Sequence, residues 1–185
     1  MKTRKIIFWI FLLIVIDQTI KIIINSFFLE VHFEIIPSLF EFKPVFNDKH
    51  SYGNVLLNKH FNINMGLWFH IIIFLCVQIF MLVLYRYFRG NISDNKKLLD
   101  VVIIFQIAGL ICALIGNLIW EKGTLDYIYL KPLFIFDLKD LFMNCFIILF
   151  LVYMSKNKSQ IKNLKIKNLI AYTRDSLKKQ LKIIP

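Results

Sequence analysis

Four long apolar runs divide this chain, and polar segments separate them. The runs cover Ile6 to about Ile24, Leu67–Phe88, Leu98–Ile119 and Leu133–Met154. A helix that crosses a membrane needs about 20 predominantly apolar residues, and each run is close to that length. The pattern therefore predicts an all-α integral membrane protein with four transmembrane helices.

The segment between the first two runs, Phe27–Gly66, has a different pattern. Val31–Ile36 alternates partly between apolar and polar residues, as a half-exposed strand does, and two prolines follow it. Asn47–Asn54 is typical of a turn-rich loop. We therefore expect a small extracytoplasmic β element between helices 1 and 2.

The third run carries Gly109, Ala113 and Gly116 at spacings of four and three, and small residues so placed allow close helix contact. Two shorter polar segments, Arg89–Lys97 and Trp120–Pro132, are expected to be loops.

The runs and their connections predict one membrane domain over residues 1–154, followed by a basic tail over residues 155–185. The tail interleaves lysines with apolar residues. An amphipathic helix on the anionic inner leaflet and a solvated tail both remain open.

Composition supports the membrane assignment and excludes other classes. Hydrophobic residues make up 58% of the chain, above the usual share for a soluble domain. The net charge of +11 would suggest nucleic acid in a soluble protein, but the basic residues lie at the ends of apolar runs. Cys76, Cys112 and Cys145 lie inside the runs without a Cys-x-x-Cys pair, so we expect buried apolar cysteines rather than disulfides or a zinc site.

The distribution of basic residues predicts the topology. Sixteen of the 23 lysines and arginines precede the first run, surround the Arg89–Lys97 loop or lie in the tail. Under the positive-inside rule these parts, with both termini, are cytoplasmic. Phe27–Gly66 and Trp120–Pro132 then face outward, with most of the acidic residues in or beside them.

Three aspartates, Asp126, Asp137 and Asp140, lie where one apolar run ends and the next begins. Ionisable groups at such places are costly and call for a functional explanation. Asp140 is about 24 Å along a helix from the cytoplasmic Lys156, near the outer boundary of the hydrocarbon. Asp137 and Asp140 are expected on one helix face, Asp126 is close enough in the chain to join them, and Asn117 can reach the same place.

The first run contains a second polar group. Asp17 and Lys21 are four residues apart and share a helix face, which predicts an internal ion pair. Asp17 lies about 18 Å along the helix from Lys5, in the outer half of the membrane. This pair therefore points toward the same leaflet as the three aspartates.

Two carboxyls in a low-dielectric setting push their pKa values apart, so that one accepts and the other donates a proton. That is what metal-free hydrolysis of a peptide bond requires. A metal site is the rival, but the four histidines lie elsewhere without ligand-like spacing. On chemical grounds alone, a proton relay and a structural cluster also remain open.

Five short motifs follow one another along the chain: Asp17-Gln-Thr-Ile-Lys21, Asn47-Asp-Lys-His-Ser-Tyr52, Gly116-Asn117-Leu-Ile, Thr124-Leu-Asp126-Tyr-Ile and Phe136-Asp-Leu-Lys-Asp140. They resemble, in turn, the Asp-Gln-x-x-Lys, Asn-x-Gly-Ala-Ala-Phe, Gly-Asn-x-x-Asp-Arg, Val-Val-Asp-Phe-Ile and Phe-Asn-x-Ala-Asp motifs of the lipoprotein signal peptidase (signal peptidase II) family. Each motif alone is weak. Five in order on four helices, over residues 1 to about 154, make a strong resemblance to a divergent member.

The resemblance implies an aspartic endopeptidase without metal or cofactor. Asp126 and Asp140 match the family's catalytic aspartates, which activate water and stabilise the tetrahedral intermediate. Asn47 and Asn117 would hold substrate backbone or lipid-linked groups. The outward segment after the first helix would form a β cradle over the substrate.

Three further residues have supporting roles under this resemblance. Asp17 and Lys21 would brace the helices behind the site, and Asp137 stands where the family has asparagine. The implied partners are a diacylglyceryl-modified prolipoprotein, cut before its lipidated cysteine, and membrane lipid, without nucleic acid. The resemblance further implies a monomer, multi-pass in the bacterial cytoplasmic (inner) membrane, with its active site at the outer leaflet.

The sequence also departs from the family pattern. Trp120-Glu121 replaces Asp-Arg, Lys139 replaces alanine, and Lys49 and His50 replace glycine and alanine. A catalytically altered or inactive relative that binds lipoprotein precursors or another membrane partner is therefore the alternative. A small proton-relay transporter is a third hypothesis, which the absence of an internal repeat disfavours.

Overall fold

The computed structural model describes residues 1–48, 52–63, 65–120, 122–164, 172 and 174. In this part of the chain four helices are long and apolar enough to cross a membrane. They are α1 (Thr3–Ile23), which continues into the π-helical turn η1 (Ile24–Phe28), α3 (Leu67–Asn91), α4 (Lys96–Leu118) and α5 (Leu138–Lys156). The four predicted transmembrane helices are thus confirmed as helices of spanning length.

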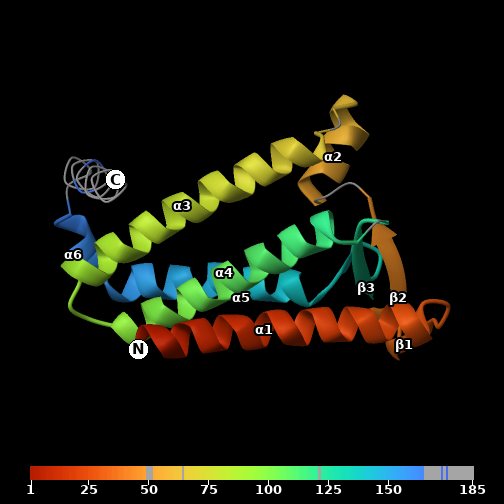
Figure 1. The fold of residues 1–185 in the computed structure, drawn as a ribbon, viewed down its shortest axis with the longest axis horizontal. Coiled ribbons are helices and arrows are strands. Elements are labelled where there is room, and N and C mark those ends of the chain that lie inside the picture. The colour runs from red at the N-terminus through yellow and green to blue at the C-terminus, as the bar shows by residue number, and fades with distance from the viewer. Residues whose placement is uncertain (49–51, 64, 121, 165–171, 173, 175–185) are drawn as a thin grey trace, which may run out of the picture.

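Helix α4 is the centre of the bundle, and α1, α3 and α5 pack around it (Figure 1). In its most apolar stretch 56% of the residues are buried, against 11% or less in the other three helices. The outer surfaces of α1, α3 and α5 expose large apolar side chains, as expected where helices face lipid. Of the three cysteines expected to be buried, Cys112 on α4 is, Cys145 is half-buried, and Cys76 is exposed because it lies on the outer surface of α3.

Small residues bring α4 close to its neighbours. A Cβ atom on Gly109 would lie 2.8 Å from Met143 Sδ of α5 and 3.3 Å from the Lys139 carbonyl oxygen. The predicted close helix contact therefore exists at Gly109. A Cβ atom on Gly116 would lie 2.7 Å from Thr124 Oγ1, so this glycine makes room for a strand instead of a helix.

A four-stranded antiparallel sheet closes one end of the bundle, in the order β1-β2-β3-β4. Strands β1 (Phe33–Ile36) and β2 (Phe40–Asn47) confirm the predicted β element after the first helix. Strand β3 (Thr124–Leu130) pairs with β2, and the short β4 (Phe134–Phe136) pairs with β3. The two segments that were predicted to face outward therefore build one sheet together.

Three predictions about the connecting segments are wrong. The Trp120–Pro132 segment is mostly strand, and the last helix begins at Leu138 instead of Leu133. The apolar residues of β4 directly precede that helix, so hydropathy alone could not separate the two elements. In addition, the helix α2 (Tyr52–Phe61) begins within the last three residues of the predicted Asn47–Asn54 loop and continues through a part of Phe27–Gly66 for which no helix was predicted.

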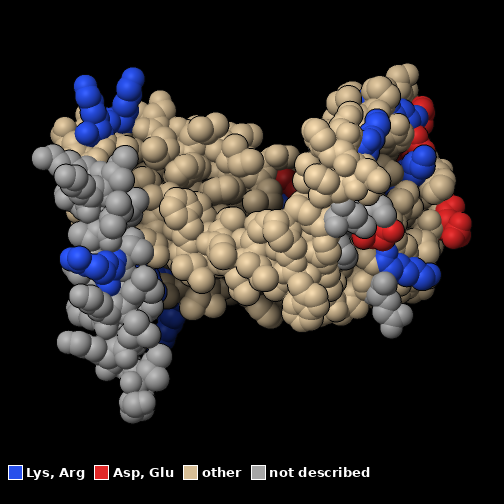
Figure 2. Space-filling model, turned by 90° about the horizontal axis from the view of Figure 1, so that it is seen from above, with Lys and Arg blue, Asp and Glu red and all other residues tan. Residues whose placement is uncertain are grey.

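The two ends of the bundle differ in the segments that form them and in the charged side chains on their surfaces. The N-terminus, the connection between α3 and α4 and the short α6 (Lys158–Lys162) lie at the end opposite the sheet (Figure 1). On the face seen in Figure 2, the surface acidic side chains gather at the sheet end. This arrangement agrees with the predicted grouping of the N-terminus and the central loop on one side of the membrane.

Candidate active site

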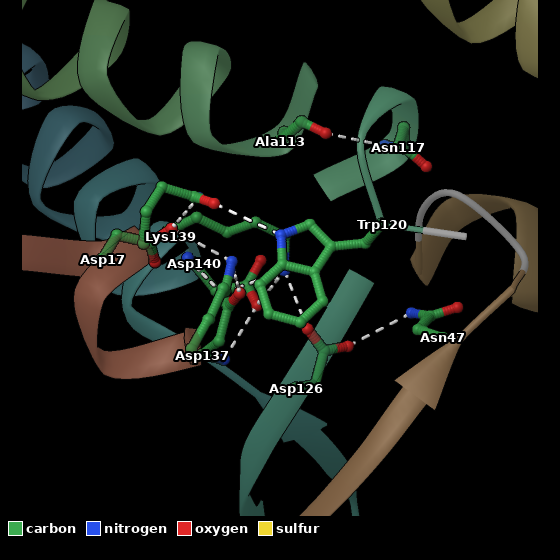
Figure 3. A network of polar contacts seen from close by, with 11 residues as sticks. Asp17, Asn47, Ala113, Asn117, Trp120, Asp126, Asp137, Lys139 and Asp140 are labelled. Carbon is green, nitrogen blue, oxygen red and sulfur yellow. Dashed lines mark hydrogen bonds and ion pairs between the residues drawn. The ribbon is translucent and has the colours of Figure 1, made fainter. Parts of the chain in front are cut away.

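Strand β3 carries Asp126 into the space between the sheet and α4. The residue lies opposite Val45 of β2 in the register, and only 5% of it is exposed. Asn47, at the end of β2, donates its amide Nδ2 to Asp126 Oδ2 at 3.2 Å (Figure 3). The strand pairing therefore fixes the backbone of Asp126, and Asn47 fixes one of its carboxylate oxygens.

Asp140 lies in the first turn of α5, where Asp137 is the N-cap. The Asp140 backbone N–H donates to Asp137 Oδ1 at 3.3 Å, and the Asp137 N–H donates to Asp140 Oδ2 at 3.2 Å. This reciprocal capping box fixes both side chains at the start of the helix. The expectation that both aspartates lie on one face inside the last helix is therefore corrected, because Asp137 precedes its first turn.

The three aspartates converge. One carboxylate oxygen from each of Asp126, Asp137 and Asp140 lies within 4.8 Å of the others. The structure thus brings together the two carboxyls predicted to form a pair, from a strand and from a helix that begins beside it. Asp137, predicted to support them, lies next to both.

Lys139 lies among these carboxylates. Its Nζ is 2.9 Å from Asp126 Oδ1, 2.9 Å from Asp137 Oδ1 and 3.2 Å from Asp140 Oδ2 (Figure 3). The group of carboxylates could in principle share a metal ion, but the lysine ammonium already supplies a positive charge at the same contacts. Sequence reasoning noted Lys139 only as a departure from the family pattern.

Burial and charge act in opposite directions on these groups. Burial raises the pKa of Asp126, and the nearby Lys139 only partly offsets that effect, so the pKa stays above its ordinary value. Burial also disfavours ionised Asp137, but there Lys139 and Lys21 outweigh burial, and the pKa of Asp137 is lowered. Asp126 is therefore the carboxyl more inclined to keep a proton, and Asp137 the one held ionised.

The predicted ion pair in the first helix lies behind the site. Lys21 Nζ is 3.1 Å from Asp17 Oδ2 and 2.6 Å from Asp137 Oδ2, and all three side chains are fully buried. The expected contact between Asp17 and Lys21 is therefore present. Its extension to Asp137 was not foreseen, and it links α1 to the start of α5.

Trp120 and Asn117 mark the outer end of α4. Trp120 donates its indole N–H to Gln18 Oε1 at 3.3 Å, and Gln18 donates to Asp17 Oδ2 at 2.7 Å. Asn117 donates to the Ala113 carbonyl oxygen of its own helix at 2.8 Å. Figure 3 places Asn117 apart from Asp126 and Asp140. The role predicted for Asn117 beside the pair stays a prediction.

A cavity of about 330 Å³ opens beside the aspartates. Figure 2 shows a hollow in this region with acidic atoms at its floor. Its walls come from α3, α4, β4 and α5 and are largely apolar, while polar groups gather toward the sheet. The lining includes Phe74, Leu110, Phe134, Phe136 and Met143 on the apolar side and Asn47, Asp126, Lys139, Asp140 and Asn144 on the polar side.

Three of the positions that depart from the family pattern, Lys49, His50 and Glu121, lie outside the described residues.

This fold and site define a polytopic membrane protein that presents two converging aspartates at the polar end of an apolar cavity. The model of the signal peptidase (SPase) II family matches residues 9–156. The chain therefore belongs to the signal peptidase II family, bacterial membrane peptidases of the aspartic type that process lipoprotein signal peptides. The resemblance seen in the sequence is confirmed.

Two solved structures share the fold, and each is described as a bacterial membrane enzyme determined by the in meso method. The first, at 2.3 Å resolution, is 21% identical over 89% of this chain and 96% of that chain, with a TM-score of 0.61. The second, at 1.9 Å resolution, is 20% identical over 83% and 94% of the two chains, also with a TM-score of 0.61. At these identities the likeness shows the fold alone. No individual curated protein matches the chain.

Proposed function

We propose that the protein is an active aspartic endopeptidase that removes the signal peptide from diacylglyceryl-modified prolipoproteins, cutting before the lipidated cysteine. One observation carries the proposal: the carboxylates of Asp126 and Asp140 converge within 4.8 Å at the polar end of the cavity. That geometry suits a water molecule held between a proton acceptor and a proton donor.

The difference in exposure between the two side chains supports separate roles for them. The Asp140 side chain is 42% exposed, so water can reach it, whereas the Asp126 side chain is 7% exposed. Asp140 then takes a proton from water as the water oxygen attacks the carbonyl carbon, and Asp126 donates a proton to the carbonyl oxygen. Collapse of the tetrahedral intermediate breaks the C–N bond. The amine of the cysteine leaves with the proton taken up by Asp140, and a hydroxyl of the intermediate returns a proton to Asp126 as the new carboxyl group forms.

The cavity suits a substrate that is half in lipid. Its apolar walls can accept part of the signal peptide or of an acyl chain, while Asn47 beside Asp126 can donate to substrate backbone. In this proposal Asp17, Lys21 and Asp137 hold α1 and α5 in register behind the reacting groups. Asn117 could meet the substrate only from the rim of the site.

The distribution of basic residues supports one orientation in the membrane. With the basic end of the bundle in the cytoplasm, both termini are cytoplasmic and the sheet and the aspartates lie at the outer leaflet of the bacterial inner membrane. Large apolar side chains are exposed around the sheet, including Phe27, Phe33 and Ile36. They support contact between this end and membrane lipid. Both aspartates come from one chain, which supports a monomer.

The test is cleavage of a purified lipidated prolipoprotein in detergent or liposomes, followed by mass spectrometry of both products. The proposal expects a new amino terminus at the lipidated cysteine, and no cleavage of the same precursor before lipidation. Cleavage at another bond, or equal cleavage of both precursors, would contradict the assigned specificity.

Binding without cleavage is the second candidate function, and one observation favours it. The Lys139 ammonium occupies the space between the two aspartates, where the attacking water would lie. If the lysine stays there with substrate bound, the protein captures precursors but leaves them intact. Stoichiometric precursor binding without product would support this candidate.

A further inference from the structure

The surroundings of Lys139 suggest a role beyond that of the aspartate pair. Its ammonium makes close contacts with Asp126, Asp137 and Asp140, and only 12% of its side chain is exposed. A solvated surface lysine gains little from such contacts, whereas a nearly buried one strongly favours the charged form of each neighbour. This cation is therefore positioned to act on the ionisation of the pair.

Asp137 and Lys139 are also a matched pair of departures. By resemblance, an asparagine and an alanine occupy these positions in the family, and both are uncharged. This chain places a negative charge at one position and a positive charge at the other, with 2.9 Å between Lys139 Nζ and Asp137 Oδ1. The two charges cancel locally, which explains how they can coexist beside two further carboxylates.

We propose that Asp137 and Lys139 form a compensating ion pair, in which Lys139 is the counter-ion of Asp126 and Asp140, and that their balance sets the pH range over which the acidic pair works. The consequence for activity rests on the proposed peptidase function. The ionisation of Asp126 itself can be followed whether or not the protein cleaves anything.

Few other charged groups near Asp126 can influence its titration. In the part of the chain that the structure describes, the titratable and charged side chains around the cluster, apart from the four residues named, are Asp17 and Lys21 of α1, Cys112 of α4 and Tyr127 of β3. Lys21 contacts Asp137 and not Asp126. Asn47 of β2 is uncharged, and the cavity walls from α3 and β4 contribute apolar side chains. Lys139 is thus the cation in direct contact with Asp126 among the described residues.

The two residues should act in opposite directions. An opposite charge in contact with a carboxyl lowers its pKa by about 1–3 units, and a like charge raises it. Removing the charge of Lys139 takes away the cation in contact with Asp126 and leaves Asp137 with Lys21 as its partner, so the titration of Asp126 moves to higher pH. Removing the charge of Asp137 takes a like charge away from Asp126 and leaves Lys139 in contact with Asp126 and Asp140 alone, so the titration of Asp126 moves to lower pH. A role in packing alone would not give shifts of opposite sign.

The experiment is a pH titration of ¹³C-carboxyl-labelled aspartate by NMR in micelles, with the Asp126 signal assigned by its loss in Asp126→Asn. Lys139→Met keeps the side-chain length, and Asp137→Asn keeps the oxygen that accepts from the Asp140 N–H. The proposal expects an upward shift of at least about one pH unit in Lys139→Met, a downward shift in Asp137→Asn, and an intermediate midpoint in the double variant. Lys139→Gln provides the same test if the methionine variant does not fold.

Lys131→Met is the matched control, since Lys131 pairs with Glu34 and Glu41 on the sheet and does not contact the aspartates. Its Asp126 midpoint should equal that of the unmodified protein. Equal midpoints in all variants, or shifts of the same sign in both single variants, would overturn the proposal.

Activity adds an independent measurement. In an active enzyme the pH profile of kcat/KM should move in the same directions as the Asp126 midpoint. If the unmodified protein cleaves nothing while the NMR shifts appear, the peptidase proposal fails and the ion-pair proposal stands. If the protein cleaves its substrate and neither substitution changes the pH profile, the peptidase proposal stands and the ion-pair proposal fails.

Discussion

Lys21 Nζ of α1 lies 2.6 Å from Asp137 Oδ2 at the cap of α5. A lysine in the first spanning helix therefore neutralises the residue that begins the last one. Because Lys21 also contacts Asp17, the three fully buried groups form a short line of alternating charge. This line joins α1 to the start of α5 beside the proposed active site.

Replacing Lys21 with methionine should destabilise the protein strongly. The substitution leaves Asp17 and Asp137 buried with less compensation, and breaking a buried ion pair in this way costs about 3–5 kcal/mol. Thermal unfolding of the purified protein in detergent measures the effect. Lys131→Met, which breaks solvent-accessible ion pairs on the sheet, should cost much less stability, because such pairs contribute little. Equal losses of stability in both variants would contradict the claim that burial makes the Lys21 ion pairs important for stability.

Gly109→Ala should disturb the site through the backbone of α5. The added methyl group would meet Met143 Sδ at 2.8 Å and the Lys139 carbonyl oxygen at 3.3 Å, so α5 must move away from α4. Overpacking of this kind costs about 1–3 kcal/mol, and we expect cleavage to fall because Asp140 moves with the helix.

Gly90→Ala is the control for that substitution, because a Cβ atom there has nothing within 4 Å. It should leave both stability and cleavage at or slightly above the original level, since alanine favours the helix more than glycine does. A Gly109→Ala protein with full activity would contradict the close contact between α4 and α5.

The lowered pKa of Asp137 makes stability depend on acid. A carboxyl whose pKa is depressed on folding contributes stability above its unfolded value, near 3.8, and loses it as pH falls through the lower folded value. We therefore expect stability to decline below about pH 4. Asp137→Asn should have a smaller decline over the same range, measured as the difference between two denaturation series. Parallel curves for the two proteins would rule out Asp137 as a source of this dependence.

Hydropathy and short motifs predicted the four long helices and the main polar residues of the site. The four long apolar runs became the four helices because a run of that length has few alternatives to a helix in a membrane. Asp126 and Asp140 were predicted as a pair from their place at the ends of these runs, and the sheet and α5 bring them together. The ion pair of Asp17 and Lys21 followed from helical spacing alone.

The sheet shows where that reasoning fails. Residues Phe134–Phe136 are apolar, so hydropathy extends the last helix through them, although they pair with Ile128–Leu130 as strand β4. Pairing between β2 and β3 joins segments about 80 residues apart, and no local pattern specifies that contact. Helix α2 is equally hard to foresee, because its ten residues mix apolar and polar side chains and follow a turn-like sequence.

Lys139 was hard to predict for a different reason. It directly follows the first residue of α5, so helical spacing would place it on a different face from Asp140. Its long side chain nevertheless reaches all three carboxylates, because β3 lies beside the start of the helix. The available signal was the joint appearance of an acid and a base, two residues apart, where the family has neutral side chains.

The most direct measurement is the cleavage rate of a lipidated prolipoprotein by the unmodified protein and by the variants Asp126→Asn and Asp140→Asn. Asparagine keeps the size of each side chain but neither takes up nor gives a proton, so each variant should lose at least about 100-fold in rate while keeping its fold. Asp94→Asn, on the loop between α3 and α4, is the matched control and should cleave normally. Full activity in either the Asp126 or the Asp140 variant would contradict the proposed catalytic pair.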